Sequence, residues 1–562
     1  MDLFKNVLFI HNTAFWGKMQ MPYYGKIISL MSEFSKYLDK KSIEYSVAEA
    51  DLIGASKDAS IFSIKPKIVV YPKSEEDISS LVDFVNTHGG YSLTPRAGGT
   101  DMTGGPLTSS IVIDISKYLN KIINISEDRF MVQPGMYFRD FDMVTRKHGY
   151  ILPSFPASRD ICTIGGMVAN NSGGEKTLIL GKTSKYVDGL DVILSDGNKY
   201  KIKPLDVGGL QRKMSQDDFE GETYRKIYTL VAKNIDIINK SKPKVSKNSA
   251  GYALWDIWDG KTFDLTKLFV GSQGTLGIIT SADLNLIHPK DLTGMIVIFL
   301  SKEEYPKIPE LVGYLKSQGA ETIEAYDKHA FSLSARYFYD FVKILGSGII
   351  SLFLRFLPEI FMTLRGGVPD MVVLAEFSGD NDKQVRDNIR AIYEGLRPKY
   401  SRIRMETSAG DIAKYRAVRR SSFQLLRTRM QDLKPASFID DLIVPIYALP
   451  QFLPELEFKL SKYDFVYTVA GHLGDGNFHI IPLLSQSQIQ DKQFIKGIMT
   501  EIYDLVLSFG GSISAEHNDG LLRVDYLKRM FGDEIYGLMV ETKKIFDPKN
   551  IFNPGKKIKI EV

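Results

Sequence analysis

The pattern of apolar and polar residues becomes regular near residue 68 and predicts alternating strands and helices. Residues 68–72 (IVVYP) are rich in β-branched side chains, and residues 78–89 (ISSLVDFVNTHG) place apolar side chains at helical spacing. Ser74 stands before this helix with an acidic residue three positions later, as in a capping box. Residues 91–96 (YSLTPR) and 109–116 (SSIVIDIS) are predicted strands. Strand, helix and strand in this order indicate an α+β or α/β domain rather than a barrel.

A second region of this kind follows a polar, mostly helical connection over residues 199–247. Residues 295–300 (MIVIFL) are a predicted strand, a helix starts near Pro306, and strands follow at 322–327 (TIEAYD) and 372–379 (VVLAEFSG). The 562 residues are too many for one ordinary domain. We therefore expect an N-terminal extension at 1–60, a first domain at 61–289, a second domain at 290–510 and a C-terminal segment at 511–562.

Composition narrows the class of protein. The 71 basic and 67 acidic residues nearly cancel, and no block of Lys or Arg occurs, so nucleic acid is not an expected partner. Cys162 is the single cysteine, so the chain can form no internal disulfide and cannot hold an iron–sulfur cluster by cysteine ligation. The N-terminus lacks the pattern of a secretory signal. These features predict a cytoplasmic protein.

One apolar stretch, residues 344–364, has two interpretations. It contains eleven uncharged residues from Ile344 to Leu354 and continues through Arg355 and Arg365, but it is too short to span a bilayer. It is either a helix or hairpin buried within a domain, or a segment that lies in a membrane interface on the inner face of the membrane.

Three glycine clusters carry the most specific pattern in the first domain. They are residues 95–105 (PRAGGTDMTGG), 162–174 (CTIGGMVANNSGG) and 271–280 (GSQGTLGIIT). Paired glycines let backbone N–H groups approach an anion closely, and Thr hydroxyls add donors. None of the clusters is the G-x-G-x-x-G of a nicotinamide-dinucleotide site or the GK[ST] loop of an ATPase.

Together with Pro134-Gly135 and residues 187–197 (VDGLDVILSDG), these clusters resemble the FAD-binding domain of the vanillyl-alcohol oxidase and p-cresol methylhydroxylase superfamily. The resemblance covers roughly residues 60–290. It implies an α+β fold: a two-subdomain FAD-binding domain of the p-cresol methylhydroxylase type, followed by an α+β, ferredoxin-like substrate cap. It also implies FAD contacts at Pro95, Arg96, Gly98, Gly99, Thr100, Asp101, Pro134, Gly135, Thr163, Gly165, Gly166, Asn170, Gly173, Gly174, Gly277, Ile279 and Asn553.

The attachment of the flavin is expected to be non-covalent. Members of this superfamily commonly attach the flavin through a His in or near the first loop, sometimes with a Cys in the second. Thr100 stands in the first loop, which has no His, and Cys162 lacks its usual companion. We therefore expect Cys162 to be a small packing residue.

The second chemical signal is a histidine cluster near the C-terminus. The chain has eight histidines, and two of them flank a turn-forming GDGN in residues 471–479 (GHLGDGNFH). A strand, a tight turn and a returning strand would bring both imidazoles to one side. Residues 512–520 (SISAEHNDG) follow about forty positions later. Two imidazoles and a carboxylate make a reasonable site for Zn²⁺ or Mn²⁺ with positions open for substrate.

This constellation resembles the bacterial and mitochondrial D-lactate, glycolate and D-2-hydroxyglutarate dehydrogenases. The resemblance implies that His472, His479 and Glu516 bind a divalent metal and that His517 acts as the base. It also implies that Arg419 binds the substrate carboxylate, although the residue three positions earlier is an Arg where the family has Trp. Residues 547–556, with DP followed by FNPGK, match the C-terminal signature of the group.

The chemistry of a small 2-hydroxy acid accounts for these residue types. Its hydroxyl and carboxylate can chelate a metal, coordination lowers the hydroxyl pKa, and an imidazole can take the proton. An Arg suits the carboxylate because its planar fork binds two oxygens. Ile439 and Ile481 stand where some members of the family carry polar groups, which favours lactate-like, glycolate-like or more apolar acids. The D configuration is implied by the family alone.

We therefore expect an FAD-dependent, metal-assisted dehydrogenase that oxidises a small 2-hydroxy acid to the 2-oxo acid. The expected electron acceptor is a quinone, a soluble electron carrier or an iron–sulfur partner subunit, because no second cofactor motif occurs. Two alternatives remain: an enzyme resembling alkyl-glycerone-phosphate synthase, which the apolar stretch at 344–364 favours slightly, and a non-catalytic FAD-binding subunit of a larger oxidase complex.

Overall fold

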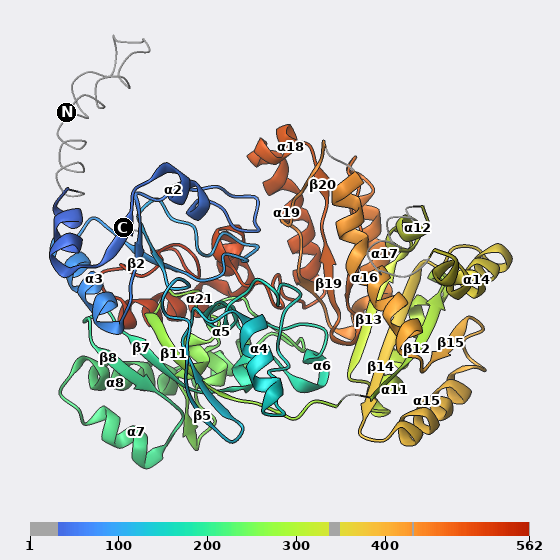
Figure 1. Cartoon of the computed structure of the whole chain (residues 1–562), viewed down its shortest axis with the longest axis horizontal. Coiled ribbons are helices and arrows are strands. Elements are labelled where there is room, and N and C mark those ends of the chain that lie inside the picture. Colours follow the sequence, from blue (N-terminus) through green and yellow to red (C-terminus); the bar gives the residue numbers. More distant parts are fainter. Residues whose placement is uncertain (1–31, 291, 337–348, 430–431, 561–562) are drawn as a thin grey trace, which may run out of the picture.

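The computed structural model describes residues 32–290, 292–336, 349–429 and 432–560. The chain forms two α+β lobes, and the C-terminal segment returns from the second lobe to the first (Figure 1). The first lobe contains a four-stranded and a five-stranded sheet, and the second contains a seven-stranded sheet. The α+β class predicted from the sequence is confirmed.

The four-stranded sheet has the order β1-β2-β4-β3. Its parallel core consists of β2 (Ile68–Tyr71), β4 (Ile111–Asp114) and β3 (Leu93–Arg96). Helix α3 (Glu75–His88) begins at Ser74, whose side chain accepts a hydrogen bond from the backbone N–H of Asp77 at 3.3 Å. The helix buries Leu81, Val82 and Val85 on the sheet. The predicted strands and helix are therefore present.

The predicted extension contributes to the same sheet. Strand β1 (Glu44–Ser46) pairs antiparallel with β2, and helix α2 (Glu49–Ala55) packs on the strands through Leu52 and Ala55. The loop that follows α2 approaches the first glycine cluster, because the N–H of Ala59 donates to the carbonyl of Asp101 at 2.9 Å.

The five-stranded sheet is antiparallel, with the order β5-β6-β11-β7-β8. It contains β5 (Ile122–Ser126), β6 (Arg129–Val132), β7 (Val187–Ile193), β8 (Lys199–Ile202) and β11 (Ile278–Asn285). The polar connection predicted as mostly helical contains α7 (Val207–Met214), α8 (Phe219–Lys233) and α9 (Ile235–Ser241).

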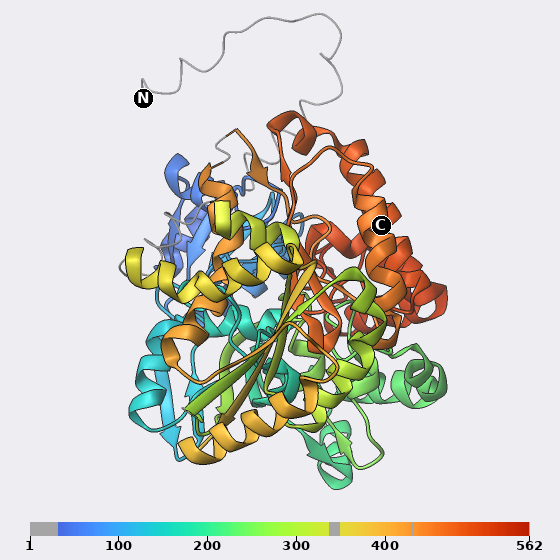
Figure 2. The ribbon, with the colours of Figure 1, turned by 90° about the vertical axis from the view of Figure 1, so that its right-hand side faces the viewer.

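The seven-stranded sheet has the order β15-β12-β14-β13-β18-β19-β17 and is covered by helices on both faces (Figure 2). Alternate residues of β12 (Leu292–Leu300) pack into two different cores: Ile296 and Ile298 belong to one, and Val297 and Phe299 to the other. Burial on both faces explains why this strand is a continuous apolar run.

Its other strands are β13 (Thr322–Asp327), β14 (Met371–Gly379), β15 (Ile403–Glu406), β17 (Leu442–Ile443), β18 (Val469–His472) and β19 (Asn477–Ile480). The helices around the sheet include α11 (Ile308–Ser317), α12 (Lys328–Arg336), α15 (Asp382–Leu396), α16 (Ala409–Arg429), α17 (Leu449–Leu460) and α19 (Lys492–Ser508).

The apolar stretch predicted at 344–364 lies partly outside the described residues, which resume at 349. From there it forms α14 (Ile349–Gly366). Met362 packs towards the sheet and Glu359 is buried, whereas Phe361 is 57% exposed and Leu364 is 77% exposed. Across the described parts of the chain, no helix combines the length and the apolarity needed to cross a bilayer.

The C-terminal segment contacts the first lobe and the loop that carries Glu516. Helix α21 (Leu527–Phe546) packs against the first lobe, and the chain then runs beside β3, where the N–H of Asn553 donates to the carbonyl of Leu93 at 2.9 Å. Lys557 is fully buried, lies 2.6 Å from the carboxylate of Asp519 and donates to the carbonyl of Ser249. This segment therefore joins residues of the glycine-cluster lobe to the loop that carries Glu516.

Replacing Lys557 with Met should destabilise the protein, because it leaves the Asp519 carboxylate buried without its cation. We expect the free energy of unfolding to fall by about 3–5 kcal/mol. Lys559→Met is the matched control, since Lys559 forms an ion pair with Asp525 in which both side chains are about half exposed; its cost should stay below about 1 kcal/mol. Urea unfolding followed by fluorescence measures both. Equal midpoints for the two variants would contradict this account.

Candidate active site

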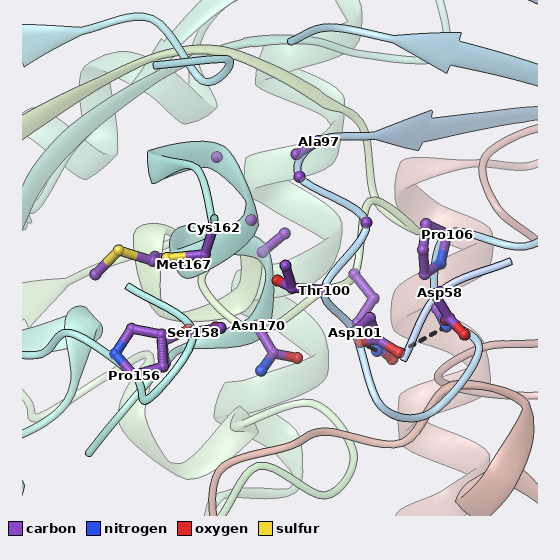
Figure 3. Close-up of a pocket in the computed structure, with 18 of the residues that line it drawn as sticks. Asp58, Ala97, Thr100, Asp101, Pro106, Pro156, Ser158, Cys162, Met167 and Asn170 are labelled. Atoms are coloured by element: carbon purple, nitrogen blue, oxygen red, sulfur yellow. Dashed lines mark hydrogen bonds between the residues drawn. The ribbon is translucent and has the colours of Figure 1, made fainter. Parts of the chain in front are cut away.

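A cavity of about 490 Å³ lies between the three glycine clusters (Figure 3). Eleven of the residues predicted to contact FAD line it: Pro95, Gly98, Gly99, Thr100, Asp101, Pro134, Gly165, Gly166, Asn170, Gly277 and Ile279. The clusters are far apart in sequence, and folding brings them to one space. The wall is largely apolar and backbone, as expected for a site that holds a large cofactor with a few directed polar contacts.

Glycine is required at the first cluster because the chain passes very close to the second. A Cβ on Gly98 would lie 2.7 Å from the carbonyl oxygen of Ile161, closer than real Cβ atoms come. Gly99 has a φ of +65°, a backbone conformation that residues with a side chain rarely adopt. The glycines thus keep backbone, rather than side chains, at the cavity wall.

Three of the predicted contacts lie beside the cavity and do not line it. The guanidinium of Arg96 points away and donates to the carbonyl of Lys57 at 2.7 Å. Thr163 caps helix α5 (Ile164–Asn170) by accepting from the N–H of Gly166. Gly135 faces backbone, since its Cβ would lie 2.3 Å from the carbonyl oxygen of Ile115. These residues support the backbone of the cavity wall and do not themselves line the cavity.

The other three join the glycine clusters to neighbouring segments. Gly173 faces Glu516, and Gly174 faces the carbonyl of Phe155. Asn553 is buried, and its side-chain amide donates to the carbonyls of Gly105 at 3.0 Å and Gln273 at 2.7 Å. Asn553 therefore ties the first and third glycine clusters to the C-terminal segment.

Cys162 lies in the cavity wall and is buried. Burial raises the pKa of its thiol to about 12, so it is a neutral, unreactive group at physiological pH. Its position and protonation fit the packing role expected from the sequence.

The two predicted ligand histidines lie on the hairpin that their spacing predicts. His472 ends β18, His479 lies in β19, and the turn between them is a short 3-10 helix closed by Gly476 in a left-handed conformation. The imidazole centroids are 5.3 Å apart and the rings are nearly perpendicular.

Glu516 and His517 lie in a loop that Asp441 holds in shape. The Asp441 carboxylate accepts hydrogen bonds from three successive backbone N–H groups, those of Ala515 at 2.9 Å, Glu516 at 2.9 Å and His517 at 2.8 Å. It also accepts from the Ser514 hydroxyl at 3.0 Å. Asp441 itself has a φ of +67°. One buried carboxylate thus fixes the backbone that carries two of the predicted site residues.

A carboxylate stands behind each imidazole. The Nδ1 atom of His472 lies 2.7 Å from Glu324, and the Nδ1 atom of His479 lies 3.1 Å from Asp440. Asp440 also lies 2.9 Å from the Nδ1 atom of His517. In metal sites, a carboxylate at one ring nitrogen fixes the tautomer and leaves the other nitrogen free to ligate. The arrangement leaves Nε2 of both predicted ligand histidines available.

The three predicted ligands form a compact set. One ligand atom from each of His472, His479 and Glu516 lies within 4.8 Å of the others. The Glu516 carboxylate also forms an ion pair with Lys247, which lies 3.0 Å from Asp475 as well. Two imidazoles and a carboxylate are a donor set that suits a divalent transition metal, and the carboxylate-backed imidazoles fit that use.

The protonation of the site follows from its buried charges. Burial alone would lower the pKa of His472, but the Glu324 carboxylate outweighs it and raises that pKa to about 8. Burial would also lower the pKa of His517, but Asp441 and Asp440 outweigh it and raise that pKa to about 9. Burial alone would raise the pKa of Glu516, but the charges of Lys247 and His472 outweigh it and hold that pKa well below the usual range. The acidic groups therefore favour cationic imidazoles in the absence of another cation.

Arg419 lies at the same site, in α16. Its guanidinium forms an ion pair with Glu324 and lies 3.4 Å from the Nδ1 atom of His472. Arg416, where the family has Trp, binds Glu376 through two hydrogen bonds and is held away from the imidazoles by that pairing. Of the two arginines, Arg419 is the one placed beside the predicted ligands.

His517 connects the two parts of the site, because it belongs to the histidine cluster and also lines the cavity. The side chain of Asn170, in the second glycine cluster, donates to the carbonyl of Glu516 at 3.0 Å. Asn518 donates to the carbonyl of Gly271, in the third cluster, at 2.9 Å. The loop of residues 514–519 is thus bonded to the cavity that the glycine clusters enclose.

Sequence reasoning missed the residues that support the site: Glu324, Asp440, Asp441 and Lys247. A signal existed for the acidic pair, because Asp440 and Asp441 interrupt an otherwise apolar run and are both buried. Glu324 carries no such signal, because polar and apolar residues alternate regularly in β13. We find no signal for Lys247 either, because its role depends on Glu516, 269 positions later in the chain.

Comparison with protein families gives two matches. Residues 66–203 match the family described as FAD binding domain, and residues 341–557 match FAD linked oxidases, C-terminal domain. The first match contains two of the glycine clusters, and the second contains the histidine cluster.

Curated relatives extend over most of the chain. A D-2-hydroxyglutarate dehydrogenase of Escherichia coli is 25% identical over 553 residues, which cover 94% of this chain and 52% of the relative. The Glycolate oxidase subunit GlcD of Bacillus subtilis is 27% identical over 505 residues, 87% of this chain and 88% of the relative. A D-lactate dehydrogenase of Archaeoglobus fulgidus is 24% identical over 538 residues, 95% of this chain and 100% of the relative. The chain spans about half the length of the D-2-hydroxyglutarate dehydrogenase of Escherichia coli.

Solved structures share the fold. A p-cresol methylhydroxylase with substrate bound superposes with a TM-score of 0.66 at 17% identity, covering 95% of this chain and 97% of that one. An alkyldihydroxyacetonephosphate synthase superposes with a TM-score of 0.62 at 16% identity, covering 98% of this chain and 87% of that one. At these identities the likeness concerns the fold alone.

Proposed function

Because this chain belongs to the FAD-linked oxidases, with the fold of p-cresol methylhydroxylase, we propose that it is an FAD-dependent dehydrogenase that oxidises a small 2-hydroxy acid to the 2-oxo acid. The observation that carries the proposal is the position of His517, which lines the cofactor cavity and also lies beside His479 and Glu516. The relatives named for D-2-hydroxyglutarate, D-lactate and glycolate support the substrate class.

The cavity residues support non-covalent FAD. The glycine clusters provide backbone N–H groups for the cofactor, and Cys162 stays protonated. When bound, the flavin supplies the acceptor for the hydride that leaves carbon 2 of the substrate. The hydrogen bonds of Asn170 and Asn518 hold the loop of residues 514–519 at the cavity in which the cofactor would bind.

His472, His479 and Glu516 would hold the divalent metal, Zn²⁺ or Mn²⁺, whose chemistry is to acidify the substrate hydroxyl. Glu324 and Asp440 orient the two imidazoles. Lys247 binds the other oxygen of Glu516 and so turns one carboxylate oxygen towards His472, 3.5 Å away.

His517 then takes the hydroxyl proton on Nε2, because its Nδ1 atom faces Asp440. A neutral imidazole is needed for this step. A divalent cation held by His472, His479 and Glu516 would lower the pKa of His517, which Asp441 and Asp440 raise to about 9. Arg419 binds the substrate carboxylate, and Glu324 orients its guanidinium.

The substrate is proposed to be lactate-like, glycolate-like or more apolar, and of D configuration. Ile439 is buried in the core of the second lobe, and Ile481 is partly buried, so neither supplies a partner for a second carboxylate. The electron acceptor is proposed to be a quinone, a soluble carrier or an iron–sulfur partner subunit.

Anaerobic flavin reduction tests the function. We expect one or more of D-lactate, glycolate and D-2-hydroxyglutarate to bleach the flavin, with lactate or glycolate faster than hydroxyglutarate. His517→Gln should slow bleaching by about 10²–10⁴-fold, because the base is lost. Arg397→Lys, at an exposed position, is a control that should bleach normally. No bleaching by any of these acids would overturn the proposal and favour a non-oxidative flavoenzyme or a non-catalytic subunit.

Glu324→Gln tests the metal site without relying on activity. The amide no longer fixes the His472 tautomer by charge, so affinity for Zn²⁺ or Mn²⁺ should fall by about 10–100-fold. Titration of the metal-free protein by calorimetry measures this. Glu310→Gln, an exposed pair with Lys399, should leave the affinity unchanged. Identical metal affinity in the wild type, Glu324→Gln and Glu516→Gln would rule out this site.

We also propose that α14 contacts the membrane surface at its exposed apolar face. Ile360, Phe361 and Leu364 lie on this face, Arg365 is exposed beside them, and the acidic Glu359 is turned inward. Such a contact would suit a quinone acceptor.

The membrane contact can be measured by co-sedimentation with vesicles that contain anionic lipid. Phe361→Asp with Leu364→Asp should reduce the bound fraction by tenfold or more, because about 3–6 kcal/mol of apolar transfer is lost. Phe458→Asp alters a comparably exposed aromatic residue on α17 and serves as the control. The proposed membrane contact would be contradicted if the double variant bound vesicles as well as the wild type, or if the wild type did not bind them.

A further inference from the structure

A short segment of the first lobe, residues 173–182, reaches the histidine hairpin of the second lobe. We call this segment the strap. It begins with the last two glycines of the second glycine cluster, contains the short helix α6 (Thr177–Leu180) and ends at Lys182. Helix α6 lies on the side of the first lobe that faces the second, and it contacts β13 there (Figure 1).

Both ends of the strap contact the loop of residues 514–519. A Cβ on Gly173 would lie 3.0 Å from an oxygen of the Glu516 carboxylate, so the missing side chain leaves the room that this carboxylate occupies. At the other end, the ammonium group of Lys182 donates to the carbonyl of Ala515 at 2.8 Å. The strap therefore lies against the loop that carries one of the three proposed metal ligands.

The middle of the strap contacts the turn of the histidine hairpin. Gly474 belongs to this turn, between His472 and His479. A Cβ on Gly474 would lie 2.7 Å from Cδ2 of Leu178 and 3.1 Å from Cβ of Ile323, in β13. Leu178 also packs against the core of the second lobe. The side chain of Leu178 therefore fills the space that glycine leaves in the turn.

Two ion pairs accompany this apolar contact. Lys176 lies 3.6 Å from Glu321, which precedes β13, and Glu175 pairs with Arg420 of α16. All four side chains keep some exposure to solvent, and ion pairs of this kind contribute little free energy. We therefore assign the larger part of the contact between the strap and the second lobe to Leu178.

We propose that Leu178 is a positioning residue for the metal site, because the strap fixes the hairpin of His472 and His479 relative to Glu516. The three proposed ligands come from two separate segments of the chain. Metal–ligand distances tolerate deviations of only about 0.2 Å, so the two segments have to be held in register. The strap is one continuous segment that contacts both of them. The inference rests on the metal site of the proposed function.

The hairpin turn has further supports, and these act on its polar groups. Lys316 of α11 donates to the carbonyl of Gly474 at 3.0 Å, and the hydroxyl of Ser246 donates to the carbonyl of Asp475 at 3.1 Å. These bonds keep the turn folded when Leu178 is shortened. We therefore expect a shorter side chain to displace the imidazoles slightly and to leave the hairpin itself intact.

Calorimetric titration of the full-length, metal-free protein with Zn²⁺ and with Mn²⁺ tests the proposal. Leu178→Ala should weaken metal affinity about tenfold, as the loss of a group that supports a ligand does. Its affinity for FAD should not change, because Leu178 does not line the cofactor cavity. Ile179→Ala is the matched control: Ile179 is the next residue of α6, is 47% exposed, and should be replaceable without effect on metal affinity.

A double variant separates positioning from a general loss of stability. Gly474→Ala alone pushes the turn away from Leu178 and should weaken metal affinity about tenfold. When Gly474→Ala is combined with Leu178→Ala, the shortened side chain makes room for the new methyl group. The loss in the double variant should therefore be smaller than the product of the two single losses, whereas independent effects would multiply.

The melting temperature of each metal-free variant shows whether it is folded, and Leu178→Val replaces Leu178→Ala should the latter not fold. The proposal is overturned if the folded Leu178 variant binds metal as the wild type does, or if the two single losses multiply in the double variant. A wild type that binds neither metal would overturn the proposed metal site, and with it the role of Leu178. FAD titration of the same samples shows separately whether the flavin part of the proposed function holds.

Discussion

The carboxylate of Asp441 is the constraint on which the candidate site depends. It is fully buried and accepts from three consecutive backbone N–H groups, of Ala515, Glu516 and His517. Backbone N–H groups that converge on one anion form a rigid local structure, because each donor would otherwise be buried without a partner. The loop conformation in turn decides where the Glu516 and His517 side chains lie. The proposed ligand Glu516 and the proposed base His517 are adjacent, and a fixed backbone between them lets their side chains face different partners.

The same loop couples the two lobes. Asn170 and Asn518 bond it to the glycine clusters, and Asp519 is held by Lys557 of the returning C-terminal segment. The histidine hairpin comes from the seven-stranded sheet of the second lobe. The cofactor cavity and the histidine hairpin therefore belong to different lobes, and His517 lies where they meet. In the proposed reaction, hydride and proton leave neighbouring atoms of the substrate, one towards the flavin and the other towards a base, so both groups have to lie near one another.

The sequence carries much of this in local patterns. The apolar pattern is strong in β2, α3 and β12, because each of these elements buries at least one apolar face and β12 buries both. The turn motif between His472 and His479 predicts their hairpin, and the glycine clusters mark a close approach of backbone, such as that of Gly98 to Ile161. Local signals of this kind survive in a single sequence.

Contacts between residues that are distant in the sequence leave no such local signal. Glu324 and Lys247 gain their roles from partners that are distant in the sequence, His472 and Glu516 respectively, and no spacing rule marks them. Arg96 is predicted to contact the cofactor from its place in a motif; in the structure its guanidinium donates to the backbone carbonyls of residues 55 and 57, contacts that the motif alone does not indicate.

The most direct measurement of the central claim is the rate of anaerobic flavin reduction by a 2-hydroxy acid deuterated at carbon 2, in the metal-loaded and the metal-stripped protein. If His517 and the three ligands act on a substrate held beside the flavin, deuteration should slow reduction several-fold in the loaded protein, and removal of the metal should slow it by orders of magnitude. Reduction that is insensitive to both deuterium and metal would contradict the account.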